Sequence, residues 1–284
     1  MKIHVPVLSR LPLIAVVAFT LAVGGLVGRA APVLATDNSI VVDTLDGGLI
    51  NGDGKCSLQE AISNANGDND AFADCASGTG LTDVITFSGI KGTIKLTAGL
   101  SLGGGSLRIE GDQKITLSLA RGVGGTVVIN NALDATLDGL TIAGGSGSTG
   151  GGIVNQGGLM ARNATIANNT ATTVGGGIYN TGVLFVDNST ISANAAASAG
   201  AGIFNMGTLT MKDSTFNRNK TTGEGGGIAN MSPGVLAFQG NNTVSHNTAG
   251  SGGGGIFNNS GTFTLATGAT ITYKGNKPDD CLCP

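Results

Sequence analysis

Apolar and polar residues alternate in short runs through most of this chain. Within a run the apolar residues lie two positions apart, which is the period of a β-strand with one buried side. The repeats hold no sustained helical period. The pattern predicts short strands, and the clearest are marked by the apolar pairs Leu184 and Val186, Leu209 and Met211, Leu236 and Phe238, and Phe263 and Leu265.

These strands belong to a repeat. One short phrase, G-G-G-I-x-N or G-A-G-I-F-N, occurs at residues 150–155, 175–180, 200–205, 225–230 and 253–258. Its closing asparagines are 25, 25, 25 and 28 residues apart. A second phrase begins with threonine and an apolar residue, keeps the same step, and ends at Asn169, Asn194, Asn219 and Asn247. Two phrases with one period indicate a repeat architecture.

A unit of about three short strands cannot bury its apolar side alone, so successive units must stack. Stacking gives parallel sheets, with Ile, Leu and Phe inside and neighbouring coils about 4.8 Å apart. Connections between parallel strands are overwhelmingly right-handed. The sequence therefore predicts an all-β fold, a right-handed parallel β-helix with a 25-residue coil, over residues 84–273.

The repeated asparagines predict polar ladders inside this solenoid. Each closing asparagine lies two residues after the isoleucine of its phrase, so both side chains point inward. An inward amide must be hydrogen-bonded, and stacked asparagines can bond to the neighbours above and below. We expect one ladder of Asn155, Asn180, Asn205, Asn230 and Asn258, and a second of Asn169, Asn194, Asn219 and Asn247.

Residues 36–83 lack the repeat and predict an N-terminal cap. Ser57 and Glu60 have the spacing of a capping box, which marks the start of a helix. One apolar stripe of that helix would contain Leu58, Ala61, Ile62 and Ala65. A short helix here is expected to cover the open end of the solenoid core.

A family resemblance lies in the same segment. The run G-D-G-K-C-S-L-Q-E-A-I-S-N-A-N, residues 52–66, resembles the N-terminal C-S-L-R-E-A motif of bacterial surface β-helix proteins, with Gln59 in place of the arginine. The repeats are similar to those of chlamydial polymorphic outer-membrane proteins. The resemblance implies an exported, cell-surface or extracellular protein, usually without an assigned enzymatic activity.

The four cysteines agree with an oxidising compartment. Cys56 and Cys75 flank the cap helix and are expected to form a disulfide. Cys281 and Cys283 lie at the far end of the solenoid. A bridge between residues two positions apart would be strained, so intermolecular pairing and free thiols remain open for this second pair.

The N-terminus predicts a secretory signal peptide. An apolar run from Leu11 to Val27 follows basic residues, and small residues ending at Ala35 offer a cleavage site. An uncleaved membrane anchor is the alternative, because the run nearly reaches spanning length. The expected organisation is a signal peptide at 1–35, a cap at 36–83, the β-helix at 84–273 and a tail at 274–284, with no membrane span in the mature chain.

Composition and charge narrow the function classes. The chain holds 50 glycines without a G-X-Y period, which excludes collagen, and its 40% apolar content argues against disorder. Loss of Lys2, Arg10 and Arg29 with the signal peptide changes the net charge from −3 to −6. Because the chain also lacks a basic cluster, nucleic-acid binding is not expected. The chain has no tryptophan, which argues against a strong carbohydrate groove.

One outward row of charged residues stands out. Arg162, Asp187 and Lys212 each follow their ladder asparagine by seven residues, and Asp213 adjoins the row. Opposite charges at coil spacing most simply attract each other. In a polysaccharide lyase or hydrolase of the pectate-lyase-like fold, Asp187 and Asp213 would instead be the catalytic carboxylates, with Arg162 or Lys212 as the base.

The sequence favours a non-catalytic structural or adhesive module that binds an extracellular protein or polysaccharide, with the polysaccharide-active enzyme as the alternative. No cofactor is expected, although the loop at residues 43–55 offers oxygen ligands for calcium from Asp43, Asp46, Asn51 and Asp53. Lys55 stands at the next alternate position, which departs from the EF-hand pattern. The segment is typical of a Gly/Asn/Asp loop.

Overall fold

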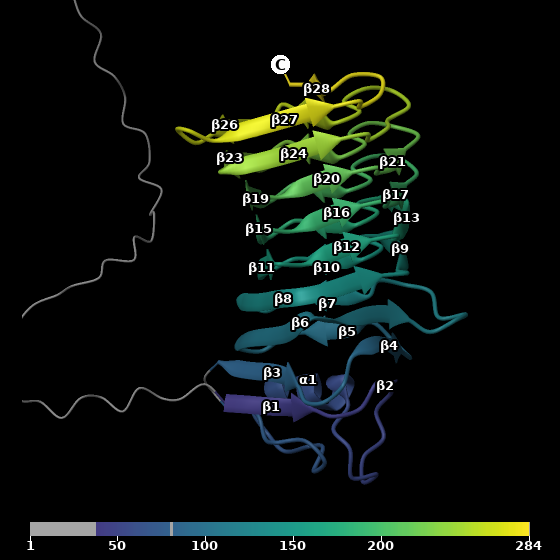
Figure 1. Ribbon diagram of the computed structural model, residues 1–284, viewed down its shortest axis with the longest axis vertical. Coiled ribbons are helices and arrows are strands. Elements are labelled where there is room, and N and C mark those ends of the chain that lie inside the picture. The colour runs from purple at the N-terminus through teal and green to yellow at the C-terminus, as the bar shows by residue number, and fades with distance from the viewer. Residues whose placement is uncertain (1–37, 80–81, 284) are drawn as a thin grey trace, which may run out of the picture. The chain divides into compact units, whose positions relative to one another are not determined.

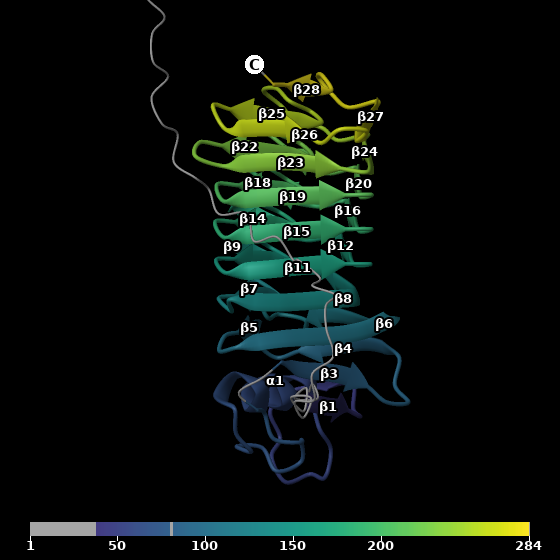
Figure 2. The same cartoon turned by 90° about the vertical axis from the view of Figure 1, so that its left-hand side faces the viewer.

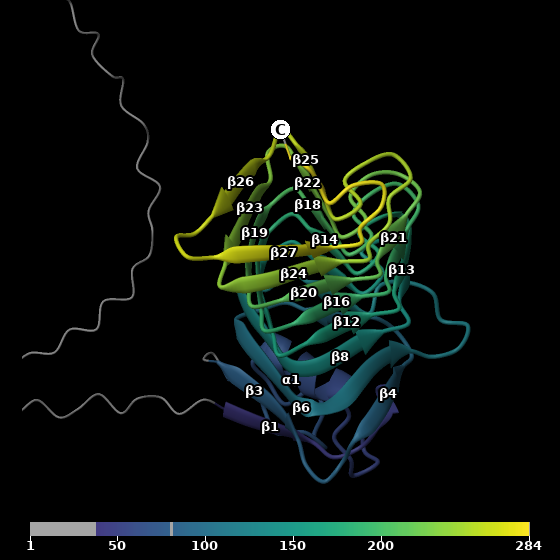
Figure 3. The same cartoon turned by 45° about the horizontal axis from the view of Figure 1, so that its top comes forward.

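Successive repeats of the chain stack as the coils of a parallel β-helix of about eight turns, roughly 25 residues apart (Figure 1). The computed structural model describes residues 38–79 and 82–283. The predicted signal peptide and its cleavage site lie outside these residues. The chain turns in the right-handed sense as it advances from β8 to β27 (Figure 3). The fold class predicted from the repeat is therefore confirmed.

Four rows of stacked strands form the sides of the solenoid, and we call these rows faces 1 to 4. Two long strands, β6 (Ser106–Leu119) and β8 (Asp134–Ala143), cross from face 1 to face 2 and join them into one sheet. Face 1 continues with β11 (Gly158–Arg162), β15 (Val183–Asp187), β19 (Thr208–Lys212), β23 (Val235–Gln239) and β26 (Thr262–Leu265). Face 2 continues with β12 (Thr165–Ala167), β16 (Thr190–Ser192), β20 (Thr215–Asn217), β24 (Asn241–Ser245) and β27 (Thr270–Lys274).

The remaining rows complete each coil. Face 3 contains β5 (Leu100–Leu102), β7 (Val128–Asn130), β10 (Ile153–Asn155), β14 (Ile178–Asn180), β18 (Ile203–Asn205), β22 (Ile228–Met231), β25 (Ile256–Asn259) and β28 (Cys281–Leu282). Face 4 contains β9 (Ser146–Thr149), β13 (Thr170–Val174), β17 (Ala195–Ala196) and β21 (Lys220–Thr221). The first coil begins with β1 (Asn38–Val42) and β2 (Asp46–Gly47), and the next coil with β3 (Asp83–Phe87) and β4 (Gly92–Leu96), which pair with them in parallel.

Equivalent residues of successive coils lie directly beside each other, which explains the strict period of the sequence. Ile178 pairs with Ile153 on one side and with Ile203 on the other. These isoleucines are buried, as are the apolar pairs of face 1 that precede β26. One core therefore runs along the whole solenoid, and each coil buries the apolar residues of its neighbours.

Glycine is required at two positions of the repeated phrase for different structural reasons. Gly175 has a φ of 68°, a left-handed conformation that L side chains rarely adopt. Gly177 has an ordinary φ, but a Cβ atom there would lie 2.6 Å from the carbonyl oxygen of Gly202 in the next coil. The first glycine makes the turn, and the other allows the backbones of two coils to approach.

The closing asparagines of face 3 form a continuous ladder. The Nδ2 atom of each donates to the Oδ1 atom of the asparagine in the next coil, at 2.6–2.7 Å from Asn130 to Asn258. All six side chains are buried. The ladder begins at Asn130 because Leu102 occupies the same position one coil earlier.

A second ladder runs where face 2 meets face 4. Each Nδ2 atom again donates to the next Oδ1 atom, at 2.9–3.1 Å, from Asn169 through Asn194, Asn219 and Asn247 to Asn276. The same Oδ1 atoms also accept a backbone N–H of the preceding coil. For example, Asn194 Oδ1 accepts from the backbone N–H of Asn169. Both lone pairs of the amide oxygen are thus used, as burial requires.

The N-terminal cap is one helix, α1 (Leu58–Gly67), held by the capping box. The Ser57 hydroxyl accepts from the Glu60 backbone N–H, and the Glu60 carboxylate accepts from that of Ser57. The helix buries its apolar stripe against the first coil (Figure 1). A disulfide joins Cys56 to Cys75. Since β1 already pairs with β3 in parallel, the strand ladder begins within the segment expected to act only as a cap.

The C-terminal tail also contributes to the solenoid. Strand β28 pairs with β25, and Asn276 extends the second ladder. Cys281 and Cys283 are joined to each other, which is the pairing that the sequence argument disfavoured. The one helix in the described part of the chain, α1, is too short and polar to cross a membrane.

Candidate functional site

Three of the predicted charged residues, Arg162, Asp187 and Lys212, occupy the same register position at the ends of β11, β15 and β19, which Figure 2 shows stacked on face 1. Arg162 pairs with Asp187 in register, and Asp187 with Lys212. The structure extends this row upstream by two carboxylates, because Asp138 lies beside Arg162 and Glu110 beside Asp138. We call these five residues the charged row.

Asp138 and Glu110 were not identified from the sequence. Asp138 follows its ladder residue Asn130 by eight positions, whereas the three predicted members follow theirs by seven. Glu110 lies in a coil whose ladder position holds leucine, so no asparagine marks the register there. Allowing one additional residue between the ladder position and the charged position would have identified both carboxylates.

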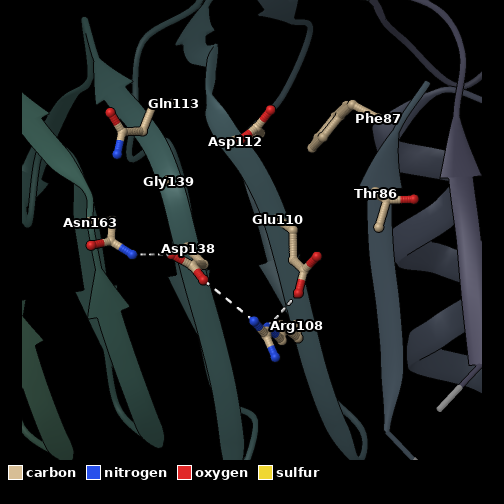
Figure 4. Close-up of a pocket in the computed structure, with 9 residues that line it drawn as sticks. All are labelled: Thr86, Phe87, Arg108, Glu110, Asp112, Gln113, Asp138, Gly139 and Asn163. Carbon is tan, nitrogen blue, oxygen red and sulfur yellow. Dashed lines mark hydrogen bonds and ion pairs between the residues drawn. The ribbon is translucent and has the colours of Figure 1, made fainter. Parts of the chain in front are cut away.

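Asp138 is the centre of the strongest interactions in the row. Its Oδ2 atom accepts from Arg162 Nη2 at 2.5 Å and from Arg162 Nε at 3.2 Å. Arg108 Nη2 lies 3.4 Å from the same oxygen, and Asn163 Nδ2 donates to Oδ1 at 2.8 Å. Arg108 also places its Nε atom 2.8 Å from a Glu110 carboxylate oxygen, as Figure 4 shows. Arg108 thus bridges the two carboxylates, and Arg162 binds Asp138 through two nitrogen atoms.

A depression of about 370 Å³ lies above this cluster. It forms where the register of β6 against β8 shifts between Glu110 and Ile115. Asp112 and Gln113 adopt left-handed conformations in this bulge and line the depression together with Phe87 (Figure 4). A bulge next to a charged cluster re-aims the side chains around it.

The charges of the cluster are mutually compensated. Burial alone would raise the pKa of Asp138, but the hydrogen bonds from Arg162 and Asn163 and the charges of Arg162 and Arg108 together lower that pKa below its ordinary value. The hydrogen bond and the charge of Asp138 in turn raise the pKa of Arg162. A carboxylate held ionised in this way is a poor general acid or base near neutral pH.

The two carboxylates proposed for catalysis have separate partners. Asp187 Oδ1 lies 3.8 Å from Lys212 Nζ, in an ion pair open to solvent. Asp213 directly follows β19 and has a left-handed backbone conformation. Its Oδ1 atom accepts from the backbone N–H of Asn241 at 2.8 Å. The structure therefore unites Arg162, Asp187 and Lys212 in one row and engages Asp213 with the next coil.

An apolar strip lies beside the charged row on face 1. It consists of Leu133, Met160, Val183 and Phe185, and borders a shallow groove of about 520 Å³. Leu133 is 87% exposed and Phe185 42%. Met160 and Phe185 are neighbours in register, and each lies two residues before a member of the charged row on its own strand. Apolar and charged side chains therefore point to the same side of the sheet.

The loop considered for calcium uses its oxygens within the protein. Asp43 accepts from the backbone N–H of Cys56, and Asp53 accepts from that of Lys55. The Asp74 carboxylate accepts from three successive N–H groups of the loop, those of residues 52–54. Within residues 38–79 and 82–283, no three His, Cys, Asp or Glu side chains are grouped to hold a metal ion.

The lowered pKa of Asp138 predicts a pH-dependent stability. The ionised carboxylate stabilises the fold above its unfolded pKa of about 3.9, and this contribution is lost as pH falls through the lower folded pKa. We expect Asp138→Asn to lower the free energy of unfolding at pH 7 by about 1–2 kcal/mol. The difference from the unaltered protein should shrink as the pH falls below the unfolded pKa and through the lower folded pKa.

Urea unfolding at a series of pH values measures this effect. Asp134→Asn is the matched control, because Asp134 is exposed at the start of the same strand, β8, and its side chain has only a long contact to Ser106. A deficit of Asp138→Asn that stays constant from pH 7 to pH 2 would show that the arginine contacts do not stabilise the ionised form.

No protein-family model matches this chain, and neither does any curated protein or solved structure. A function must therefore be inferred from the described surface.

Proposed function

We propose that this protein is an exported, non-catalytic surface module that binds an extended macromolecule along face 1. The observation that carries the proposal is the apolar strip beside the charged row. Exposed apolar side chains that form a contiguous patch mark interaction sites on soluble proteins. Because the strip follows stacked coils, its shape suits a chain that lies along the solenoid axis.

The charged row gives such a partner a register. Charges that alternate along Asp138, Arg162, Asp187 and Lys212 favour a ligand whose polar groups recur at the coil spacing, about 4.8 Å. Arrangements of this kind contribute more to specificity than to affinity. The apolar strip would then supply most of the binding free energy, with Phe185 as its aromatic anchor.

The contacts of the carboxylates favour this function over polysaccharide cleavage. Lyases and hydrolases need carboxylates that converge on one reacting bond. Here Asp138 is neutralised by two arginines, and Asp187 and Asp213 face different partners. Export belongs to the same proposal, and the Cys56–Cys75 disulfide supports it because such bonds persist in oxidising compartments.

Binding of the labelled protein to arrayed polysaccharides and extracellular proteins tests the proposal. We expect Phe185→Lys to weaken the captured interaction more than tenfold, the effect of losing an anchor of about 2 kcal/mol. Thr243→Lys is the control, since Thr243 points outward from β24 on face 2. Both variants should keep the melting temperature of the parent protein.

A depolymerisation assay on pectins, alginates and glycosaminoglycans distinguishes the binding module from a polysaccharide-cleaving enzyme. The proposal predicts no new chain ends with any polymer. Turnover that Asp187→Ala or Asp213→Ala abolishes would overturn it, as would binding that Phe185→Lys leaves unchanged.

A further inference from the structure

The two ends of the solenoid core are covered differently. At the N-terminal end, α1 lies over the first coil, and the inward residues Ile40 and Val42 of β1 are fully buried. At the other end, inward positions reach the surface. Phe238 in β23 is 0% exposed, whereas Leu265, its register partner in β26, is 50% exposed.

The same change occurs on face 2. Val244 in β24 is buried, while Tyr273 beside it in β27 is only partly covered. Ile271, the other inward residue of β27, is also partly exposed. The last coil of the described chain therefore presents four residues of core type at its surface: Phe263, Leu265, Ile271 and Tyr273.

Among the strands that the structure describes, none pairs with the outer edge of this coil. Strands β26 and β27 end their sheet, as the top of Figure 1 shows. The N–H groups of Thr262 and Thr270 donate to the preceding coil. Since donors alternate along a strand, those of residues 263, 265, 271 and 273 point away from it.

The two edge strands have few of the features that normally block pairing. T-F-T-L and T-I-T-Y-K contain no proline, and Lys274 is their one charged residue. Threonine, isoleucine, phenylalanine and tyrosine all favour strands. Proline, inward charges and bulges are the usual protection of an exposed edge. These nine residues are suited to accept another strand.

We propose that the edge formed by β26 and β27 pairs with the same edge of a second copy, tail to tail. In one copy β26 runs toward the corner between faces 1 and 2, and β27 runs away from it (Figure 3). A two-fold axis through that corner sets β26 of each copy antiparallel to β27 of the other. Both edges are then paired, and Phe263 and Leu265 of each copy lie beside Ile271 and Tyr273 of the other.

Two further observations favour a second copy as the occupant. The charged residues of the last coil are Lys274, Lys277, Asp279 and Asp280, which sum to zero, so two such ends approach without net repulsion. At the opposite end α1 covers the apolar core, so that end offers no equivalent apolar surface for head-to-tail addition. The contact therefore closes at a dimer rather than growing into a fibre.

Sedimentation of the full chain across a range of concentrations tests the proposal. One chain has a mass of 27.9 kDa, and we expect a species of twice this mass at micromolar and higher concentrations. Leu265→Lys places a charge on an already exposed side chain at this edge and should give the single mass with an unchanged circular dichroism spectrum. Ile271→Pro is a second disrupting variant, because the N–H that it removes points to the open edge.

Val41→Lys is the matched control. Val41 is an outward strand residue with similar exposure, 42%, at the opposite end of the solenoid. The control should remain dimeric. A single mass at every concentration would overturn the proposal, as would a dimer that survives both Leu265→Lys and Ile271→Pro. Assemblies that keep growing with concentration would also overturn it, because the tail-to-tail contact closes at two copies.

Discussion

Replacement of Asn205 by leucine should lower the free energy of unfolding by about 2–4 kcal/mol, because it leaves buried polar atoms without partners. Asn205 Oδ1 accepts from Asn180, and Asn205 Nδ2 donates to Asn230. The Asn230 oxygen would lose that donor. Asn180 would keep only its longer contacts to Gly182 and Thr208.

A melting curve measures this cost. For a chain of this size each kcal/mol corresponds to about 2–4 °C in Tm, so a fall of about 5–15 °C is expected. Asn259→Leu is the matched control, since Asn259 lies next to the ladder residue Asn258 but is exposed. Equal melting temperatures for the two variants would show that the ladder contributes little beyond solvent-exposed asparagine.

The ladder and the fold were predictable for the same physical reason. In a solenoid each inward position meets its own copy one coil away, so a residue that bonds or packs with itself recurs at the coil period. Asn180 and Ile178 reveal both the period and the inward direction. The cap helix was predictable from local chemistry, because the exchange of hydrogen bonds between Ser57 and Glu60 needs only four residues.

The candidate site was less predictable because outward positions carry no such requirement. Arg162, Asp187 and Lys212 were found only because the ladder gave their register. Asp138 was missed through one additional residue in a turn. The depression beside it depends on a bulge in β6 that no repeat foreshadows.

The ends of the solenoid were also hard to predict. There a strand has a neighbour on one side, so the period is lost. The pairing of β1 with β3 and of β28 with β25 involves segments without the repeated phrases. The bridge between Cys281 and Cys283 was disfavoured by spacing alone, which takes no account of how the tail lies against face 3.

Loss of the Cys56–Cys75 disulfide should be the other large effect. The bond closes a loop with a sequence separation of 19, and removal of such a bond costs about 2–4 kcal/mol. It connects the start of α1 to the segment whose Asp74 side chain holds the loop at residues 52–54. The double variant Cys56→Ala/Cys75→Ala should therefore destabilise the cap.

Denaturant unfolding with and without reductant separates this disulfide from the second one. Reductant should destabilise the unaltered protein and a Cys281→Ala/Cys283→Ala variant to a similar extent. It should have little effect on Cys56→Ala/Cys75→Ala. If the variant without Cys281 and Cys283 were insensitive to reductant, the stabilising bond would lie in the tail instead.

A more specific test is which coils lose protection from hydrogen exchange when the disulfide is removed. Each coil of a solenoid contacts only its neighbours, so a weakened cap should open the nearest coil and leave distant coils intact. Hydrogen exchange of Cys56→Ala/Cys75→Ala should therefore speed up in β1 and β3 while the amides of β18 stay protected. Uniform loss of protection along the chain would mean that the solenoid unfolds as one cooperative unit, with the cap as part of it.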